Sequence, residues 1–170
     1  MKRLIVIIAA IALLPKLAGS AEYSRTVSAE NVIENRGGKV LLVPRSGLSK
    51  RIERFAVIHG ANPTIAPQIA ELLATCEHPR VLAAIAARES NFNENAIGSK
   101  HEIGMFQVLP SVHGHPGKTW ADQTKTSERI LHDLISESDG DLRTGVRKYN
   151  GSGAAARKYA SHVMRMARSI

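Results

Sequence analysis

The chain contains 170 residues, of which 44 % are hydrophobic, and its 23 Lys and Arg residues against 15 Asp and Glu residues give a net charge of +8. This composition excludes a disordered chain, a collagen-like repeat and a multi-pass membrane protein, and the length predicts one main domain. A single cysteine excludes an internal disulfide and a multi-cysteine zinc site. The positive charge suggests a polyanionic partner. Aromatic residues, however, make up only 4 % of the chain, too few for a platform that stacks single-stranded nucleic acid.

Residues 1–21 have the pattern of a secretory signal peptide. Lys2 and Arg3 precede an apolar run over residues 4–14, Pro15 ends that run, and small residues follow. The run is shorter than the roughly 20 residues that a membrane-spanning helix needs, although an uncleaved anchor is the alternative. Cleavage after residue 21 would lower the net charge to +5 and leave no integral membrane segment. We therefore expect an exported protein of the periplasm or cell envelope, which argues against a nucleic-acid partner.

Residues 22–61 are predicted to form an N-terminal arm. Two short β-prone stretches, residues 32–33 and 40–43, flank an Arg-Gly-Gly sequence at 36–38 that could turn a hairpin. An extended arm lying on the domain or on a partner is the alternative. A short helix is expected over residues 50–58.

The apolar spacing from Asn62 onward predicts helices. Asn62 and Pro63 are typical of a helix start, and the apolar residues after them follow a helical period as far as Cys76. Cys76 is therefore expected to be a buried thiol rather than a nucleophile. Pro79 is expected to begin the next helix, which continues to Ser90.

The second half of this region is predicted to be loop followed by helices. Residues 91–118 are rich in Asn, Gly, Pro and His and predict a long loop or short helical pieces. Helices are predicted over residues 127–136 and 142–148, and a last helix follows the break at 151–153. Its basic face is expected to be solvated, or else to be attracted to an anionic cell wall. The predicted fold is mostly α, with a short irregular or β-prone N-terminal arm before the helical domain at 62–170.

Glu89 does not fit the helix that carries it. Leu82, Ile85 and Ala86 form an apolar stripe, and Glu89 lies on the same stripe nearly two turns after Leu82. A carboxyl group there is expected to be partly desolvated, which raises its pKa and lets it donate a proton near neutral pH. A solvated glutamate at the helix end, or one paired with Arg88, is the alternative.

Three motifs stand in a fixed order after this helix. They are Glu-Ser-Asn-Phe-Asn-Glu-Asn-Ala at 89–96, Gly-Met-Phe-Gln-Val-Leu-Pro at 104–110 and Tyr-Asn-Gly at 149–151, followed by Tyr159. Together they resemble the lytic transglycosylase family, whose fold is that of the soluble lytic transglycosylases and goose-type lysozyme. The resemblance covers residues 62–166. It implies a lysozyme-like α-helical domain that cleaves the glycan strands of peptidoglycan.

The resemblance also implies roles for individual residues. Glu89 matches the catalytic acid and base of the family. The positions that it places at the substrate are Ser90, Ser99, Gly104, Met105, Phe106, Gln107, Tyr149 and Asn150. Among these, Gln107 would line the cleft, Gly104 would let the backbone pass close to a sugar, and the Tyr149 hydroxyl would point toward the catalytic site. Ser90 would help to hold the helix end.

Two positions depart from the family pattern. Gly98 stands where the family often has a serine, and Ser99 follows one residue later. Lys148 replaces the alanine before Tyr149, which makes the rim of the cleft more basic. Neither change affects Glu89.

The mechanism that the resemblance implies needs one carboxylate, whereas most glycosidases use two. Glu94 and Glu102 lie in the loop outside the family's catalytic positions, and Asp122 and Asp133 are expected at a cap and on a solvated face. In the family, the N-acetyl group of N-acetylmuramic acid stabilises the oxocarbenium ion. Glu89 would protonate the glycosidic oxygen and then accept the proton of the C6 hydroxyl, which leaves a 1,6-anhydro end.

No metal or organic cofactor is implied, and His113 and His115 are expected to be loop residues rather than a metal pair. A lysozyme-type muramidase and a non-catalytic peptidoglycan-binding assembly component stay open as alternatives. The single small module favours local opening of the wall for a secretion, conjugation, pilus or phage apparatus. Residues 22–61 are then the candidate segment for docking to that apparatus.

Overall fold

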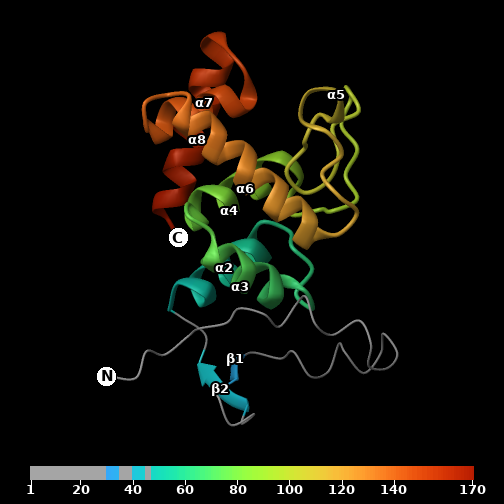
Figure 1. Ribbon diagram of the computed structural model, residues 1–170, viewed down its shortest axis with the longest axis vertical. Coiled ribbons are helices and arrows are strands. Elements are labelled where there is room, and N and C mark those ends of the chain that lie inside the picture. Colours follow the sequence, from blue (N-terminus) through green and yellow to red (C-terminus); the bar gives the residue numbers. More distant parts are fainter. Residues whose placement is uncertain (1–29, 35–39, 45–46) are drawn as a thin grey trace. The chain divides into compact units, whose positions relative to one another are not determined.

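The computed structural model describes residues 30–34, 40–44 and 47–170 (Figure 1). The chain divides into two compact units, Met1–Gly47 and Leu48–Ile170. The predicted signal peptide at 1–21 lies outside the described residues.

The described part of the first unit is a pair of antiparallel strands. Strand β1 (Glu30–Glu34) pairs with β2 (Val40–Pro44), and the register places Val32 opposite Leu42. Both strands lie where the sequence predicts β-prone stretches, in agreement with the expected β-prone arm. The Arg-Gly-Gly sequence predicted to connect them lies outside the described residues.

The second unit is helical. Its helices, the first of which starts at Gly47, are α2 (Gly47–Ile58), α3 (Ala66–Thr75), α4 (Pro79–Ser90), α5 (Pro110–His113), α6 (Trp120–Ser136), α7 (Leu142–Asn150) and α8 (Gly153–Arg168). Helix α4 contacts α3, α6 and α8, and α7 contacts both α6 and α8. This arrangement confirms the predicted mostly α, lysozyme-like fold class.

Helix α3 begins later than predicted. Residues 63–65 form a turn, in which the Asn62 side chain accepts a hydrogen bond from the backbone N–H of Thr64 at 2.9 Å. The helix then starts at Ala66, with Pro67 in its first turn, where a missing N–H does no harm. Asn62 therefore organises the approach to the helix instead of capping it directly.

Helix α6 begins well before the predicted start at residue 127. The Thr119 side chain caps it by accepting a hydrogen bond from the backbone N–H of Asp122 at 3.1 Å. The first turns bury Gln123 and Thr124, which are polar. Apolar spacing cannot reveal a helix whose buried positions are polar, so the sequence pattern missed these turns.

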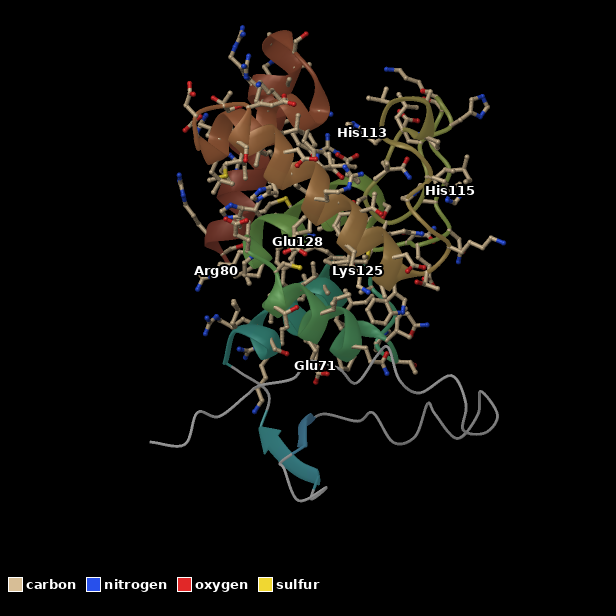
Figure 2. The ribbon with its side chains drawn as sticks, in the orientation of Figure 1. Glu71, Arg80, His113, His115, Lys125 and Glu128 are labelled. Carbon is tan, nitrogen blue, oxygen red and sulfur yellow. The ribbon has the colours of Figure 1, made fainter. Side chains whose placement is uncertain are left out.

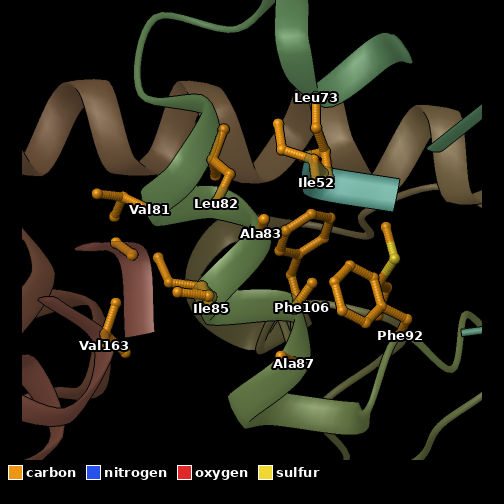
Figure 3. Close-up of a cluster of buried hydrophobic side chains, with 14 of the residues drawn as sticks. Ile52, Leu73, Val81, Leu82, Ala83, Ile85, Ala87, Phe92, Phe106 and Val163 are labelled. Carbon is orange, nitrogen blue, oxygen red and sulfur yellow. The ribbon is translucent and has the colours of Figure 1, made fainter. Parts of the chain in front are cut away.

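The core forms around α4. Every residue from Val81 to Ala87 is buried, so this helix is enclosed on all sides and is not a one-sided amphipathic helix. Figure 3 shows α4 among the side chains of Ile52 from α2, Leu73 from α3 and Val163 from α8. The last turn of α4 directly follows this buried stretch, so a side chain there lies next to a region without water.

Helix α2 lies within the arm predicted for residues 22–61, yet it belongs to the helical core. Ile52, Phe55 and Ala56 are buried, and the Arg51 guanidinium donates a hydrogen bond to the carbonyl of Ile170 at 2.7 Å. The compact unit therefore begins at Leu48, because these apolar side chains need the core to leave water.

Cys76 is a buried free thiol, as predicted. Its burial, the charge of Glu128 and a hydrogen bond with that carboxylate together raise the thiol pKa to about 12. The side chain therefore stays protonated and packs as a small apolar group. No helix among the described residues has the length and apolar content needed to cross a membrane.

Candidate active site

Glu89 occupies the last turn of α4, where the enclosed part of the helix opens to the surface. Its neighbour Arg88 is exposed, whereas Glu89 is half-buried. The Tyr159 hydroxyl, from α8, donates a hydrogen bond to Glu89 Oε1 at 2.5 Å. The contact between α4 and α8 thus brings together two residues that are 70 positions apart in the chain.

The pKa of Glu89 is raised above its usual value of 4.5. Desolvation by burial is the main cause, and it outweighs the hydrogen bond from Tyr159 and the charge of Arg88, which both favour the carboxylate. The charge of Glu102 raises the pKa further. This environment favours the protonated acid that the sequence predicts at this position.

Helix α4 ends one residue after Glu89, and its C-cap Asn91 has left-handed backbone. Asn91 and Phe92 have φ angles of 53° and 63°, and further along His101 and Gln107 have 64° and 49°. Left-handed backbone is rare for residues other than glycine, and it is strained for a large side chain such as Phe92. Burial of the Phe92 ring, edge-on to Phe55, helps to hold the turn. Strained residues of this kind gather at functional sites.

The second motif forms a loop beside Glu89, residues 104–107, which we call the motif loop. Side chains from three helices hold its backbone. Ser90 Oγ donates to the carbonyl of Met105 at 2.8 Å, and the Met105 N–H donates to Gln123 Oε1 at 2.7 Å. The Tyr149 hydroxyl donates to the carbonyl of Phe106 at 3.2 Å. The motif loop is therefore fixed before any substrate arrives.

Packing inside the protein requires a glycine at position 104. Its φ is 79°, and a Cβ there would lie under 3.0 Å from the amide group of Gln123. That amide is buried and joins two parts of the loop region, because its Nε2 also donates to the carbonyl of Glu94 at 2.9 Å. A glycine at 104 thus leaves room for the buried amide that orients the motif loop.

The side chains of Gln107 and Glu102 both lie against Gly98. A Cβ on Gly98 would lie under 3.0 Å from both Glu102 Oε2 and Gln107 Oε1, so this glycine leaves space for the two side chains. Gln107 Nε2 also donates to the carbonyl of Gly104 at 2.9 Å. Hydrogen bonds from backbone N–H groups, including that of Lys100, lower the pKa of Glu102. An ionised carboxylate therefore lies close enough to Glu89 to act on its pKa.

The remaining predicted substrate positions divide into buried and exposed ones. Met105 and Phe106 are fully buried, so their side chains support the motif loop from within the core. Ser99 and Asn150 are exposed, the first in the loop and the second at the end of α7. Tyr149 is half-buried, and this burial raises the pKa of its hydroxyl. The charge of Glu89 raises that pKa further, whereas the interaction with Ser127 lowers it.

Three residues of this site were not assigned to it from the sequence. Tyr159 is named in the sequence only as the residue that follows the third motif, although a buried tyrosine usually needs a hydrogen-bond partner. Gln123 left no apolar signal, and Glu102 lies outside the family's catalytic positions. The structure brings all three to Glu89 or to the motif loop.

The loop histidines are surface residues. Figure 2 shows His113 and His115 on the segment around α5, and both are exposed. Within residues 47–170 and the two strands, no three His, Cys, Asp or Glu side chains are grouped as metal ligands would be. Asp122 belongs to the cap of α6 and Asp133 pairs with Arg129 on an exposed face, as expected.

Comparison with known proteins identifies the family. A family model described as the transglycosylase SLT domain matches residues 69–169, which is more than half of the chain and includes Glu89 and the motif loop. No curated protein and no solved structure gives a significant match. The chain therefore belongs to the transglycosylase SLT domain family, whose members act on peptidoglycan.

Proposed function

We propose that this protein is a lytic transglycosylase that cleaves the bond between N-acetylmuramic acid and N-acetylglucosamine, with Glu89 as its only acid and base. The observation that carries the proposal is the half-buried Glu89 carboxyl, whose pKa burial raises and whose Oε1 is held by Tyr159. A carboxyl group whose pKa is raised by burial keeps its proton to higher pH and can give it to a leaving oxygen.

In the first step, the Glu89 carboxyl gives its proton to the glycosidic oxygen as the bond to the muramic C1 breaks. The N-acetyl oxygen of the same sugar stabilises the cation at C1. The Glu89 carboxylate then takes the proton of the C6 hydroxyl, whose oxygen bonds to C1. The products are a free N-acetylglucosamine hydroxyl and a 1,6-anhydro end, and Glu89 is protonated again. Tyr159 donates to Oε1 throughout and stabilises the carboxylate between the two steps.

A lysozyme-type hydrolysis of the same bond is the second candidate, and Glu102 is the observation that favours it. Its ionised carboxylate interacts with Glu89 through its charge. A protonated and an ionised carboxyl in one site is the pattern of glycosidases that use two carboxylates. In that mechanism, water would attack C1 and leave a reducing end.

The products separate the two candidates. Purified protein would be incubated with sacculi, and the released muropeptides would be analysed by mass spectrometry. Anhydro ends support the transglycosylase, reducing ends identify a hydrolase, and Glu102→Gln should leave anhydro products unchanged. Binding to sacculi with no release by either route would instead favour a non-catalytic assembly component.

The cellular role is part of the same proposal. Export through residues 1–21 would bring the catalytic unit to the wall, and residues 22–61 would dock on an envelope-spanning apparatus that needs a local opening. Support comes from the sequence pattern of the first segment and from the strands β1 and β2 in the second. Deleting residues 22–46 should keep muropeptide release in vitro and abolish co-purification with the apparatus.

A further inference from the structure

Positive charge is concentrated in one part of the helical unit. Residues 142–170, which include α7 and α8, contain seven Lys and Arg residues and no Asp or Glu. Residues 48–141 contain nine Lys and Arg against twelve Asp and Glu, a balance of −3. The two parts of one compact unit therefore have opposite net charge, which is typical of a protein that meets a charged surface from one side.

The cations of helix α8 lie on its exposed face. Its inner face buries Ala156, Tyr159, Ala160, Val163 and Ala167 against the core. The opposite face carries four exposed cations, Arg157, Lys158, Arg165 and Arg168, over about 16 Å of helix length. This row of cations is called the α8 basic face below.

The cations of the α8 basic face are not neutralised within the described residues. No acidic side chain of that part of the chain lies within ion-pair distance of them. Arg143 of α7 adds a further charge at this face, because its guanidinium donates to Ser161 Oγ at 2.7 Å. The hydrogen-bond partner of the Arg165 guanidinium is His162 Nδ1, at 3.0 Å, and not an acidic side chain. The positive field is therefore available to an external partner.

The α8 basic face also contains a shallow hollow of about 520 Å³. The residues that line it are Ala154, Arg157, Lys158, Ser161, His162 and Arg165. This hollow is separate from the catalytic site, because Tyr159 reaches Glu89 from the opposite face of the same helix. A helix with its side chains is about 10–12 Å thick, so a glycan strand at Glu89 lies across the helix from these cations.

We propose that the α8 basic face binds the surface of an anionic phospholipid bilayer. Several cations without acidic partners on one helix face match a dense layer of phosphate charges, and their field extends about 8–10 Å from the surface at moderate salt. The apolar side of α8 is committed to the core, so contact is electrostatic and the helix does not insert. Binding in this manner holds the enzyme beside the membrane while Glu89 stays open to the wall.

The test compares vesicles of phosphatidylglycerol and phosphatidylcholine with vesicles of phosphatidylcholine alone. Co-sedimentation of the full chain is measured at low and high salt. The readout is the ratio of the affinity for the anionic vesicles to the affinity for the neutral vesicles. Each cation near an anionic bilayer strengthens binding about fivefold, so Arg157→Gln, Lys158→Gln and Arg165→Gln together should lower the ratio about a hundredfold. Residues 4–14 are apolar and unchanged in every variant, so their contribution cancels in the comparison.

The matched control removes three exposed cations elsewhere, Lys100→Gln, Lys118→Gln and Lys125→Gln. Lys125 lies on α6 (Figure 2), and the control loses the same net charge as the α8 variant. All six side chains are exposed, and equal thermal midpoints verify that both variants fold. The expected result is a nearly unchanged affinity ratio for the control and for Glu89→Gln, which keeps this test independent of the catalytic proposal.

Three results would overturn the inference. The first is equal binding of the parent to anionic and neutral vesicles. The second is an equal loss in the control, which would mean that only total charge matters. The third is a loss of binding to sacculi in the α8 variant with vesicle binding unchanged, which would assign the α8 basic face to a wall polymer.

Discussion

The strongest test of the site's architecture is the substitution Gly104→Ala. The new methyl group would lie under 3.0 Å from three atoms of the Gln123 amide, which is buried and bonded on both sides. The backbone at Gly104 cannot relieve this overlap by rotation, because its N–H donates to the carbonyl of Ala96 at 2.8 Å. Gln123 must move, and both of its hydrogen bonds are then lost or distorted.

The expected loss of stability has two parts. An alanine at a φ of 79° costs about 1–2 kcal/mol because its Cβ approaches the following carbonyl oxygen. The hydrogen bonds from the Met105 N–H and to the Glu94 carbonyl contribute about 0.5–1.5 kcal/mol each. We therefore expect the free energy of unfolding to fall by about 2–5 kcal/mol. Release of the Met105 N–H should also displace the motif loop and reduce muropeptide release.

Gly140→Ala is the matched control. Gly140 has a φ of 80°, almost the same as Gly104, but a Cβ there would meet nothing within 4 Å. It should lose only the backbone part, about 1–2 kcal/mol, with activity unchanged. Both free energies would be measured by urea unfolding, with the slope m compared to verify that the transition is of the same kind. Equal losses in the two variants would refute the role assigned to Gln123.

Three further predictions concern ionisable groups. Tyr159→Phe should move the fall of activity at high pH upward by about one pH unit or more, because a hydrogen bond to a carboxylate is worth about 1.5–3 kcal/mol; an unmoved pH profile of muropeptide release would contradict the role of Tyr159. Glu89→Gln should abolish release. Because the folded-state pKa of Glu89 is raised above 4.5, its ionisation lowers stability as pH rises from 4.5 through that pKa. The variant should therefore melt higher than the parent at neutral pH and equally below pH 4.5, and a lower melting temperature at neutral pH would count against a desolvated acid. The Cys76 thiol, with its pKa raised to about 12, should resist a thiol-specific reagent in the folded protein and react only on unfolding; fast labelling of the native state would show that it is accessible.

Local patterns were sufficient for much of the fold. The start of α4 at Pro79 and its end at Ser90 follow from residues adjacent in sequence, and the structure has both. Apolar spacing also located the core faces of α3 and α8 and the buried Cys76. These features depend on interactions within one or two helical turns, which a sequence pattern contains.

Apolar spacing failed where buried positions are polar. No helix was predicted for the first turns of α6, because Gln123 and Thr124 interrupt the apolar spacing, although both are buried. The partner that allows Gln123 to be buried is the motif loop, 18 residues earlier in the chain. No local pattern contains that contact.

The sequence by itself determined the family, the mostly α fold and the position of Glu89 in three ordered motifs, and the match to residues 69–169 agrees with that assignment. The net charge of +8 indicated an anionic partner without saying where the charge lies. Only the tertiary structure decided which groups surround Glu89, because Tyr159, Glu102 and Gln123 reach the site through packing between distant segments. It also decided that the cations of α8 gather on one outer face, since that face exists only once the opposite side of the helix is buried.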